Sequence, residues 1–552
     1  MSKLENTLKH QLNDNEAVTY PDFNKMWDRI EKVEDTFQEK ISATNVRGGH
    51  RARNWRRITI AASLSALLAA APVYAAIQYD WGNLLSQKHG IQAALEQNLG
   101  QPLGQSVTKD GVTLTLHTAI VDENRTVILY SVDVGGKADK EFWKVKGLSL
   151  KDEQGNSIEA EYNYEQWDEK QQRYNGYFES DWTPGEGETK VTLTAAAVQS
   201  FNQAEQELSL NSNSTEPQTF QLDVEGMKSI EVKPFAKSEN KQLFSSAVTF
   251  NNPDAKKWAY PQLVAYRGST RVEPLPEAVF GTPGDNGEYT IKQYFKASEI
   301  PDGQTTYKLQ YTKLERSISG GWSFDLQLSK KQMESGTIKT ALNAPLEAGD
   351  TMHSFEKMVI TPTQIRVILR AEEQYKQLPY YKYNLEVGGT VLEGYLYLSP
   401  DDDPYLITLK FERPAGLVID EQTDITFVGK YKVTNHDDDK TPLLLKNISA
   451  EKQTVIRDTG GYEVKWTYYM QGKDLYVETE SDDPHFGGVN QTYIGLGKER
   501  IPGRPVTVNF AGDGNNKAID VYKDFKGTEA SIYMFNYTTD EPDKETRVQL
   551  RP

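Results

Sequence analysis

The chain of 552 residues contains no cysteine. Disulfide bonds, thiolate zinc sites and cysteine nucleophiles are therefore excluded. A protein of this size without disulfides must hold its domains together by burial alone. Cysteine-free exported proteins are common in Gram-positive bacteria, and on that association we expect a source of this kind.

Catalytic motifs are also missing. Only five of the seven histidines lie beyond residue 80, and no two of these five have the spacing of metal ligands. There is no His-Glu-x-x-His motif, no Gly-x-Ser-x-Gly nucleophile elbow and no phosphate-binding loop. We therefore expect a protein that is not an enzyme, with no catalytic residue, no metal and no cofactor.

Positive charge is scarce, with 62 basic residues against 79 acidic ones and a net charge of −17. A nucleic-acid-binding protein needs a basic face to neutralise phosphates, so this composition argues against nucleic acid as a partner. The simplest interpretation of the acidity is solubility. The length calls for several domains, since one core rarely serves more than about 250 residues.

Long apolar runs are rare as well, and only one is long enough to cross a bilayer, which takes about 20 residues. It extends from Ile58 to Tyr79 without a charge and ends at Asp80. Basic residues favour the cytoplasmic flank of a span. Four arginines precede this run, and they predict a cytoplasmic N-terminus and an extracellular C-terminal region at the cell membrane; they are Arg51, Arg53, Arg56 and Arg57.

Two further features bear on the interpretation of this run as a membrane span. Trp81, just beyond it, fits an interfacial aromatic belt. Val73-Tyr74-Ala75 resembles the cleavage site of a secretory signal peptide, which is the alternative interpretation. We prefer a retained anchor, because more than fifty residues precede the run and carry a helical pattern of their own.

The front segment, residues 1–57, has an amphipathic pattern. Apolar residues recur at intervals of three or four, which predicts a helix with one apolar face; they are Phe23, Trp27, Ile30, Val33 and Phe37. This face either packs on a second short helix or the inner leaflet, or binds a cytoplasmic protein as a helix in a groove. For the second case we assign partner contact to Phe23, Trp27, Ile30 and Val33.

Beyond the span, residues 80–100 have a helical pattern, which we interpret as a helix packed on the first outer domain. The period then changes to two, and apolar residues alternate from Val112 to Leu116 and from Ile128 to Val134 around a turn at Asp122–Arg125. This predicts an antiparallel hairpin. Short strands with close turns continue to the end, although Ala195–Leu208 has room for a helical turn or two. We expect a mainly β protein with tandem Ig-like sandwiches of about 100 residues each.

Composition shifts divide the outer region into four β-domains. We place them at residues 101–227, 228–345, 346–438 and 439–552. Acidic runs at Asp401–Asp403 and Asp437–Asp439 lack the spacing of a calcium loop and are expected to be solvated turns. The aromatic segments Tyr380–Tyr383 and Trp466–Tyr469 fit either buried cores and domain contacts or outward platforms for glycan or peptide.

The first 135 residues resemble a bacterial family. The shared features are Tyr20-Pro21-Asp22-Phe23 followed by Met26-Trp27, the arginine-rich stretch, one span, a short outer helix and the hairpin at Asp122–Arg125. They resemble single-pass membrane anti-sigma-factor-like proteins of Bacillus and Paenibacillus type, with an extracytoplasmic domain of unknown function. The resemblance implies a cytoplasmic sigma factor as partner. The chain lacks the zinc ligands of the better-defined anti-sigma class.

Two functions follow as hypotheses. The first is a membrane regulator that couples the outer β-domains to a sigma factor. The alternative is an adhesin-like protein of the cell surface or wall, whose front segment only flanks its anchor.

Overall fold

The structure is a computed structural model, and it describes residues 81–136, 141–214, 216–235, 240–276, 279–283, 287–348, 351–374, 378–397, 403–437, 441–506 and 516–551. All of the described residues belong to one compact unit of the chain, which begins at Leu68. The expected cytoplasmic segment and the expected span lie outside the described residues. Across the described ranges, no helix is long and apolar enough to cross a membrane.

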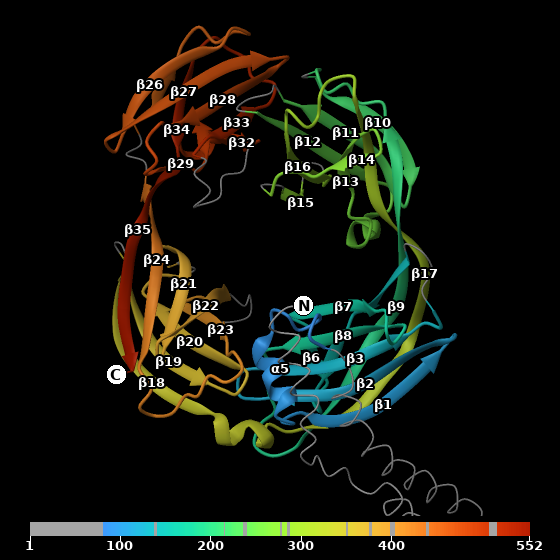
Figure 1. The fold of residues 1–552 in the computed structure, drawn as a ribbon. Helices are drawn as coiled ribbons and strands as arrows, with labels where there is room; N and C mark the ends of the chain where they lie inside the picture. The colour runs from blue at the N-terminus through green and yellow to red at the C-terminus, as the bar shows by residue number, and fades with distance from the viewer. Residues whose placement is uncertain are drawn as a thin grey trace, which may run out of the picture. The chain divides into compact units, whose positions relative to one another are not determined.

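The described residues confirm a mainly β protein with antiparallel sheets (Figure 1). The first sheet has the order β1-β2-β3-β8-β7, formed by β1 (Gln101–Lys109), β2 (Val112–Val121), β3 (Thr126–Asp133), β7 (Tyr162–Asp168) and β8 (Arg173–Ser180). The predicted hairpin is β2 paired with β3, with Thr113 opposite Asp133.

The second sheet has the order β14-β13-β17-β9-β5-β6, and β4 also pairs with β9. Its strands are β4 (Glu141–Lys146), β5 (Ser149–Lys151), β6 (Ser157–Glu159), β9 (Thr189–Leu208), β13 (Gln262–Arg267), β14 (Thr270–Val272) and β17 (Thr305–Leu328). Buried side chains of both sheets form the first core, including Leu114, Phe178, Leu193 and Phe324.

The third sheet has the order β10-β11-β12-β16-β15. It contains β10 (Gln218–Val224), β11 (Met227–Pro234), β12 (Lys241–Phe250), β15 (Val279–Pro283) and β16 (Tyr289–Lys296), with the short helix η1 (Pro253–Lys257) after β12. The second core joins this sheet to β13 and to the far parts of β9 and β17, through Phe244, Phe295, Leu208 and Leu309.

The fourth sheet has nine strands in the order β18-β19-β20-β23-β22-β21-β24-β35-β29. They are β18 (Ile338–Ala348), β19 (Thr351–Ile360), β20 (Gln364–Ala371), β21 (Tyr380–Val387), β22 (Thr390–Tyr397), β23 (Leu406–Glu412), β24 (Ile425–Asp437), β29 (Phe486–Val489) and β35 (Asn536–Arg551). The helix η2 (Lys331–Gly336) precedes β18. The sheet encloses the third core, which includes Phe355, Phe411 and Phe427.

Two smaller sheets complete the fold. One has the order β25-β34-β30-β31 and the other β26-β27-β28-β33-β32. Trp466, Leu475 and Ile532 lie in the fourth core between them. The elements are β25 (Leu443–Leu445), β26 (Gln453–Thr459), β27 (Tyr462–Gln471), β28 (Asp474–Glu480), β30 (Thr492–Ile494), η3 (Gly497–Glu499), β31 (Ile501–Pro502), β32 (Arg504–Pro505), β33 (Ala518–Tyr522) and β34 (Ala530–Met534).

The four cores are nested in the chain rather than arranged in tandem. β9 and β17 lie side by side along most of their length, and the second core is built from the residues between them (Figure 1). β24 and β35 pair in the same way around the fourth core. β9 and β17 each contribute side chains to the first and second cores, and β35 contributes to the third and fourth, whereas the core residues of β24 belong to the third. The predicted boundaries stay predictions; the one at 227 and 228 falls at the start of β11.

The stretch Ala195–Leu208 is extended, so the prediction of a helical turn there was wrong. It lies within β9, and Ala195, Ala197 and Val198 are buried in or beside the first core. Alanine favours helices in isolation, but here β17 supplies a hydrogen-bonded partner along the whole stretch. Tertiary pairing therefore overrides the local preference.

Part of the helical pattern predicted at residues 80–100 forms a helix, since turns lead into α5 (His89–Glu96). Ile91 and Ala94 of α5 pack with Ile120 and Leu129 of the first sheet. Trp81 belongs to the same cluster and is only 4% exposed, so its assignment to a membrane interface was wrong. The indole is buried in protein because the turns before α5 fold back onto the sheet.

Gly90 brings α5 against the turn between β19 and β20. A Cβ at this position would lie 1.8 Å from the Thr363 carbonyl oxygen, so only glycine permits the contact. α5 thus touches elements of both the first and the third core.

We predict that Gly90→Ala destabilises the protein by about 1–3 kcal/mol, as overpacking usually does. Alanine is a better helix former than glycine, so any loss must come from the contact with Thr363. Gly185→Ala is the matched control, because a Cβ added at Gly185 would have no atom within 4 Å. Thermal unfolding of both variants measures the effect, and equal melting temperatures would contradict it.

Candidate functional site: a buried network of charged side chains

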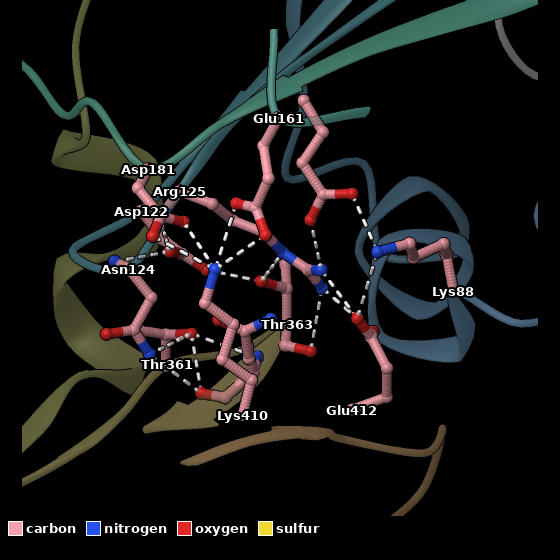
Figure 2. A network of polar contacts seen from close by, with 12 residues as sticks. Lys88, Asp122, Asn124, Arg125, Glu161, Asp181, Thr361, Thr363, Lys410 and Glu412 are labelled. Carbon is pink, nitrogen blue, oxygen red and sulfur yellow. Dashed lines mark hydrogen bonds and ion pairs between the residues drawn. The ribbon is translucent and has the colours of Figure 1, made fainter. Parts of the chain in front are cut away.

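A group of charged side chains is buried where α5, the β2–β3 turn and the end of β8 meet the β19–β20 turn and the end of β23. Figure 2 shows this group, which we call the charge network. Its charged members are Lys88, Asp122, Arg125, Glu161, Glu179, Asp181, Arg366, Lys410 and Glu412. They come from positions more than 300 residues apart in the sequence.

Arg125 is the centre of the network and is fully buried. Its Nη1 donates to Glu179 Oε1 at 2.8 Å and to Glu412 Oε1 at 2.6 Å. Its Nη2 donates to Glu412 Oε2 at 2.9 Å and to the Thr363 carbonyl at 3.0 Å, and its Nε donates to Thr363 Oγ1 at 3.0 Å. All five N–H groups of the guanidinium are satisfied.

The tight β2–β3 turn presents Arg125. Asp122 Oδ1 accepts the backbone N–H groups of Asn124 and Arg125 at 2.8 and 3.1 Å, which closes an Asx turn. Asp122 Oδ2 accepts the Thr363 hydroxyl at 2.5 Å. Asn124 Nδ2 donates to the carbonyls of Val359 and Gln364, both at 3.1 Å. One turn of the first sheet is therefore bonded to one turn of the fourth.

Lys88 connects α5 to the same carboxylates. Its Nζ lies 2.7 Å from Glu179 Oε2 and 3.8 Å from Glu412 Oε1, and it also lies 4.5 Å from the centre of the Tyr162 ring. Lys88 is the residue immediately before α5. The start of the helix is thus held by an ion pair as well as by the close contact at Gly90.

Lys410 forms a second buried centre beside the first. Its Nζ lies 2.9 Å from each carboxylate oxygen of Glu161 and Asp181, and 3.3 Å from the centre of the Tyr397 ring. Arg366 also pairs with Asp181. Lys410 lies on β23, between core residues Leu409 and Phe411. Its own side chain faces the first sheet, whose carboxylates neutralise it.

Burial and charge shift the pKa values in this network. Burial works against the charge of Arg125, but Glu412 and Glu179 raise the pKa of its guanidinium well above the usual value. Burial also opposes ionisation of Glu179, yet Arg125 and Lys88 hold the pKa of its carboxyl below the usual value. Both groups therefore stay charged at neutral pH, and each depends on the other.

Glu161 behaves differently. Burial raises the pKa of its carboxyl to about 7 and the neighbouring Asp181 charge adds to this, although Lys410 opposes it. Lys410 and Arg366 instead hold the pKa of Asp181 below its usual value, despite burial. Two carboxylates thus share the Lys410 ammonium, and of these two carboxyls Glu161 is the one with the raised pKa.

The chemistry available here is positioning rather than catalysis. The charged groups are fixed by hydrogen bonds to one another and none is an activated nucleophile. Within the described ranges, no group of His, Asp or Glu could hold a metal ion. Removing one partner of a buried ion pair costs about 3–5 kcal/mol. The network therefore joins the two sheets through several buried polar contacts.

The residues that we predicted for partner binding and topology are not among the described residues. Phe23, Trp27, Ile30 and Val33 lie outside the described residues, as do Arg51, Arg53, Arg56 and Arg57. Asp403 is described, and it pairs with Arg370 at 3.0 Å on the surface.

The predicted aromatic segments have mixed environments. Trp466 and Tyr468 are in the fourth core, and Tyr380 is in the third. Tyr469 stacks on Tyr476 at 5.5 Å in a cluster that also contains Leu243 of β12. Tyr381 is 50% exposed. Burial in cores and contacts between sheets therefore explains most of these rings.

Sequence reasoning recognised the Asp122–Arg125 turn but not its burial. A polar turn between apolar strands is usually exposed, and nothing local shows that another sheet covers it. Lys410 was the available signal, because it interrupts the apolar run from Leu406 to Phe411. A lysine within a buried strand requires a carboxylate partner.

Comparisons with known proteins agree with part of the predicted resemblance. The family model "Domain of unknown function (DUF4179)" matches residues 50–133, which include Lys88, Asp122 and Arg125. This confirms a domain of unknown function in the first 135 residues; the match carries no sigma-factor role. No curated protein matches the chain.

Two chains of solved structures match. One is "The crystal structure of the conserved domain protein from Bacillus anthracis", at 10% identity and a TM-score of 0.32, covering 82% of this chain and 92% of that chain.

The raised pKa of Glu161 predicts a pH effect. The folded state binds more protons than the unfolded state between the ordinary value of 4.5 and about 7, so the contribution of Glu161 to stability falls as pH rises through this window. Glu161→Gln removes this titration. We expect the variant to gain stability relative to the natural protein as pH rises from 5 to 8.

Chemical denaturation across that pH range measures the difference. The control is Glu159→Gln, which makes the same replacement at an exposed glutamate on strand β6, outside the charge network. A pH-independent difference for Glu161→Gln would refute the prediction.

Proposed function

We propose that the protein is a single-pass membrane regulator that couples its outer β-domains to a cytoplasmic sigma factor, as an anti-sigma factor. The observation that supports this proposal is the attachment of α5. His89 is ten residues beyond the predicted span, and the helix that begins there is tied to two sheets by Lys88 and Gly90. A movement between those sheets therefore acts on the segment next to the span.

A passive anchor has no need of such an attachment. An adhesin-like protein requires only that its outer domains stay linked to the membrane, and a flexible linker does this. Buried ion networks stabilise less than apolar contacts of the same size, because desolvation offsets the attraction. We infer that the charge network serves to define one arrangement of α5 and the two sheets.

Because of the same network, the two sheets separate only when enough free energy is supplied to break its contacts. Separating the fourth sheet from the first would break the contacts of Arg125 with Glu412 and Thr363 together. Each charge left buried without its partner costs several kcal/mol. The closed arrangement therefore withstands small disturbances, and when it opens these contacts break together. A two-state element of this kind transmits a signal.

In this proposal the N-terminus is cytoplasmic and the β-domains are extracellular. The four arginines from Arg51 to Arg57 fix that orientation. The apolar face of the front helix then holds the sigma factor through Phe23, Trp27, Ile30 and Val33.

We predict that a sigma factor co-purifies with the full chain from native membranes and is lost with Trp27→Asp, because a carboxylate cannot enter an apolar groove without desolvation. Glu31→Gln, on the polar face of the same helix, is the control and retains the partner. Equal recovery with Trp27→Asp would refute the contact assignment. If deletion of residues 2–39 left transcription unchanged while envelope binding persisted, the adhesin-like alternative would hold instead.

A further inference from the structure

A cleft of about 750 Å³ opens beside the first core, and none of its lining residues belongs to the charge network. Its walls come from both sheets that enclose this core: β7 and β8 on one side, and β4, β9, β13 and β17 on the other. Its size lies in the range of sites for small molecules. Its lining combines aromatic rings, amides and carboxylates, with no lysine or arginine in the lining.

Aromatic rings form part of the wall. Trp167 and Tyr174 meet edge to face with centroids 4.9 Å apart, and the Tyr174 hydroxyl donates to the Glu141 carbonyl at 3.0 Å. Trp167 is half-buried on β7, packs against the first core and also lines the cleft. A ring fixed in this way offers a rigid apolar face at low entropic cost.

Carboxylates stand on both walls and are held in place. Glu205 accepts the Tyr266 hydroxyl at 2.6 Å, Lys308 at 3.0 Å and Gln310 at 3.3 Å. Glu165 accepts the Tyr130 hydroxyl at 2.7 Å and the Val145 N–H at 2.9 Å. These positioned acceptors suit a ligand that brings many hydroxyl donors, and they repel an anionic one.

Amide side chains complete the lining. Gln166 and Gln203 make no side-chain hydrogen bond to any other residue of the described ranges, so their donors and acceptors are available to a ligand. Amides can donate and accept at once, as sugar hydroxyl and acetamido groups do.

We propose that this cleft binds an uncharged, hydroxyl-rich oligosaccharide, with a sugar ring on Trp167 and its hydroxyls on the amides and on Glu205. This site goes beyond the proposed regulatory function and does not require a sigma factor. The ligand of the outer region would then be an uncharged oligosaccharide.

The test uses the full chain in a detergent without a sugar headgroup. Isothermal titration calorimetry compares three tetrasaccharides: an uncharged β-1,4 tetramer of N-acetylglucosamine, the cationic glucosamine tetramer, and an anionic one alternating glucuronate with N-acetylglucosamine. We expect saturable binding of the uncharged tetramer and none of the anionic one. Absence of binding by the uncharged tetramer, or equal binding of the anionic one, would overturn the proposal, as would binding of the cationic tetramer alone.

Variants locate the site. Trp167→Ala should weaken binding by roughly tenfold or more, because it removes the stacking face. Tyr164→Ala is the matched control, since Tyr164 lies on the same strand, is 52% exposed and is not part of the cleft lining. Circular dichroism checks folding. If Trp167→Ala fails to fold, Gln203→Ala is the variant that tests the site. Gln203 is exposed, so its replacement should not disturb folding, and loss of its amide should still weaken binding several-fold. Unchanged affinity in a folded cleft variant would place the ligand elsewhere.

Discussion

A buried guanidinium has to find an acceptor for each of its five N–H groups, and Arg125 finds them on residues of two separate sheets. Glu179 belongs to the first sheet, whereas Thr363 and Glu412 belong to the turn before β20 and the end of β23 in the fourth sheet. Neither part alone satisfies the charge. Arg125 is therefore the central one of several polar side chains that hold the first and third cores together, and α5 is attached to both parts through Lys88 and Gly90.

The long strand pairs extend this dependence to the other cores. β9 and β17 both contribute to the first and second cores, so these two cores share backbone hydrogen bonds; β35, which pairs with β24, contributes to the third and fourth. A further cluster, with Leu243, Tyr476 and Val521, joins the third sheet to the last. A ligand bound in the cleft would contact β9 and β17, and these strands also contribute side chains to the second core. This is a physical route by which an outer ligand and the charge network influence each other.

Local patterns were sufficient to predict the class of the fold and several of its elements. The alternation from Val112 to Leu116 predicted β2, and the apolar spacing after Trp81 predicted α5. The bulge in β2 near His117 was not predictable, yet it shifts the alternation so that Ala119 and Val121 also face the first core. Nesting was missed because pairing of β9 with β17 joins residues more than a hundred positions apart, and no local signal records it. The charge network was missed for the same reason. The local sequence around Asp122 is typical of an exposed turn, and only the folded structure shows that Thr363 covers it.

The central claim is that the far side of the charge network controls the order of α5. Hydrogen exchange of the α5 amides in Glu412→Gln tests it most directly, because Glu412 lies on β23 while α5 begins at His89. The account predicts that exchange in α5 rises at least about tenfold, since Arg125 loses a charged partner and local opening becomes easier. Glu356→Gln, a surface change near Arg370, should leave α5 unaffected. Unaltered exchange in α5 of folded Glu412→Gln would contradict the account.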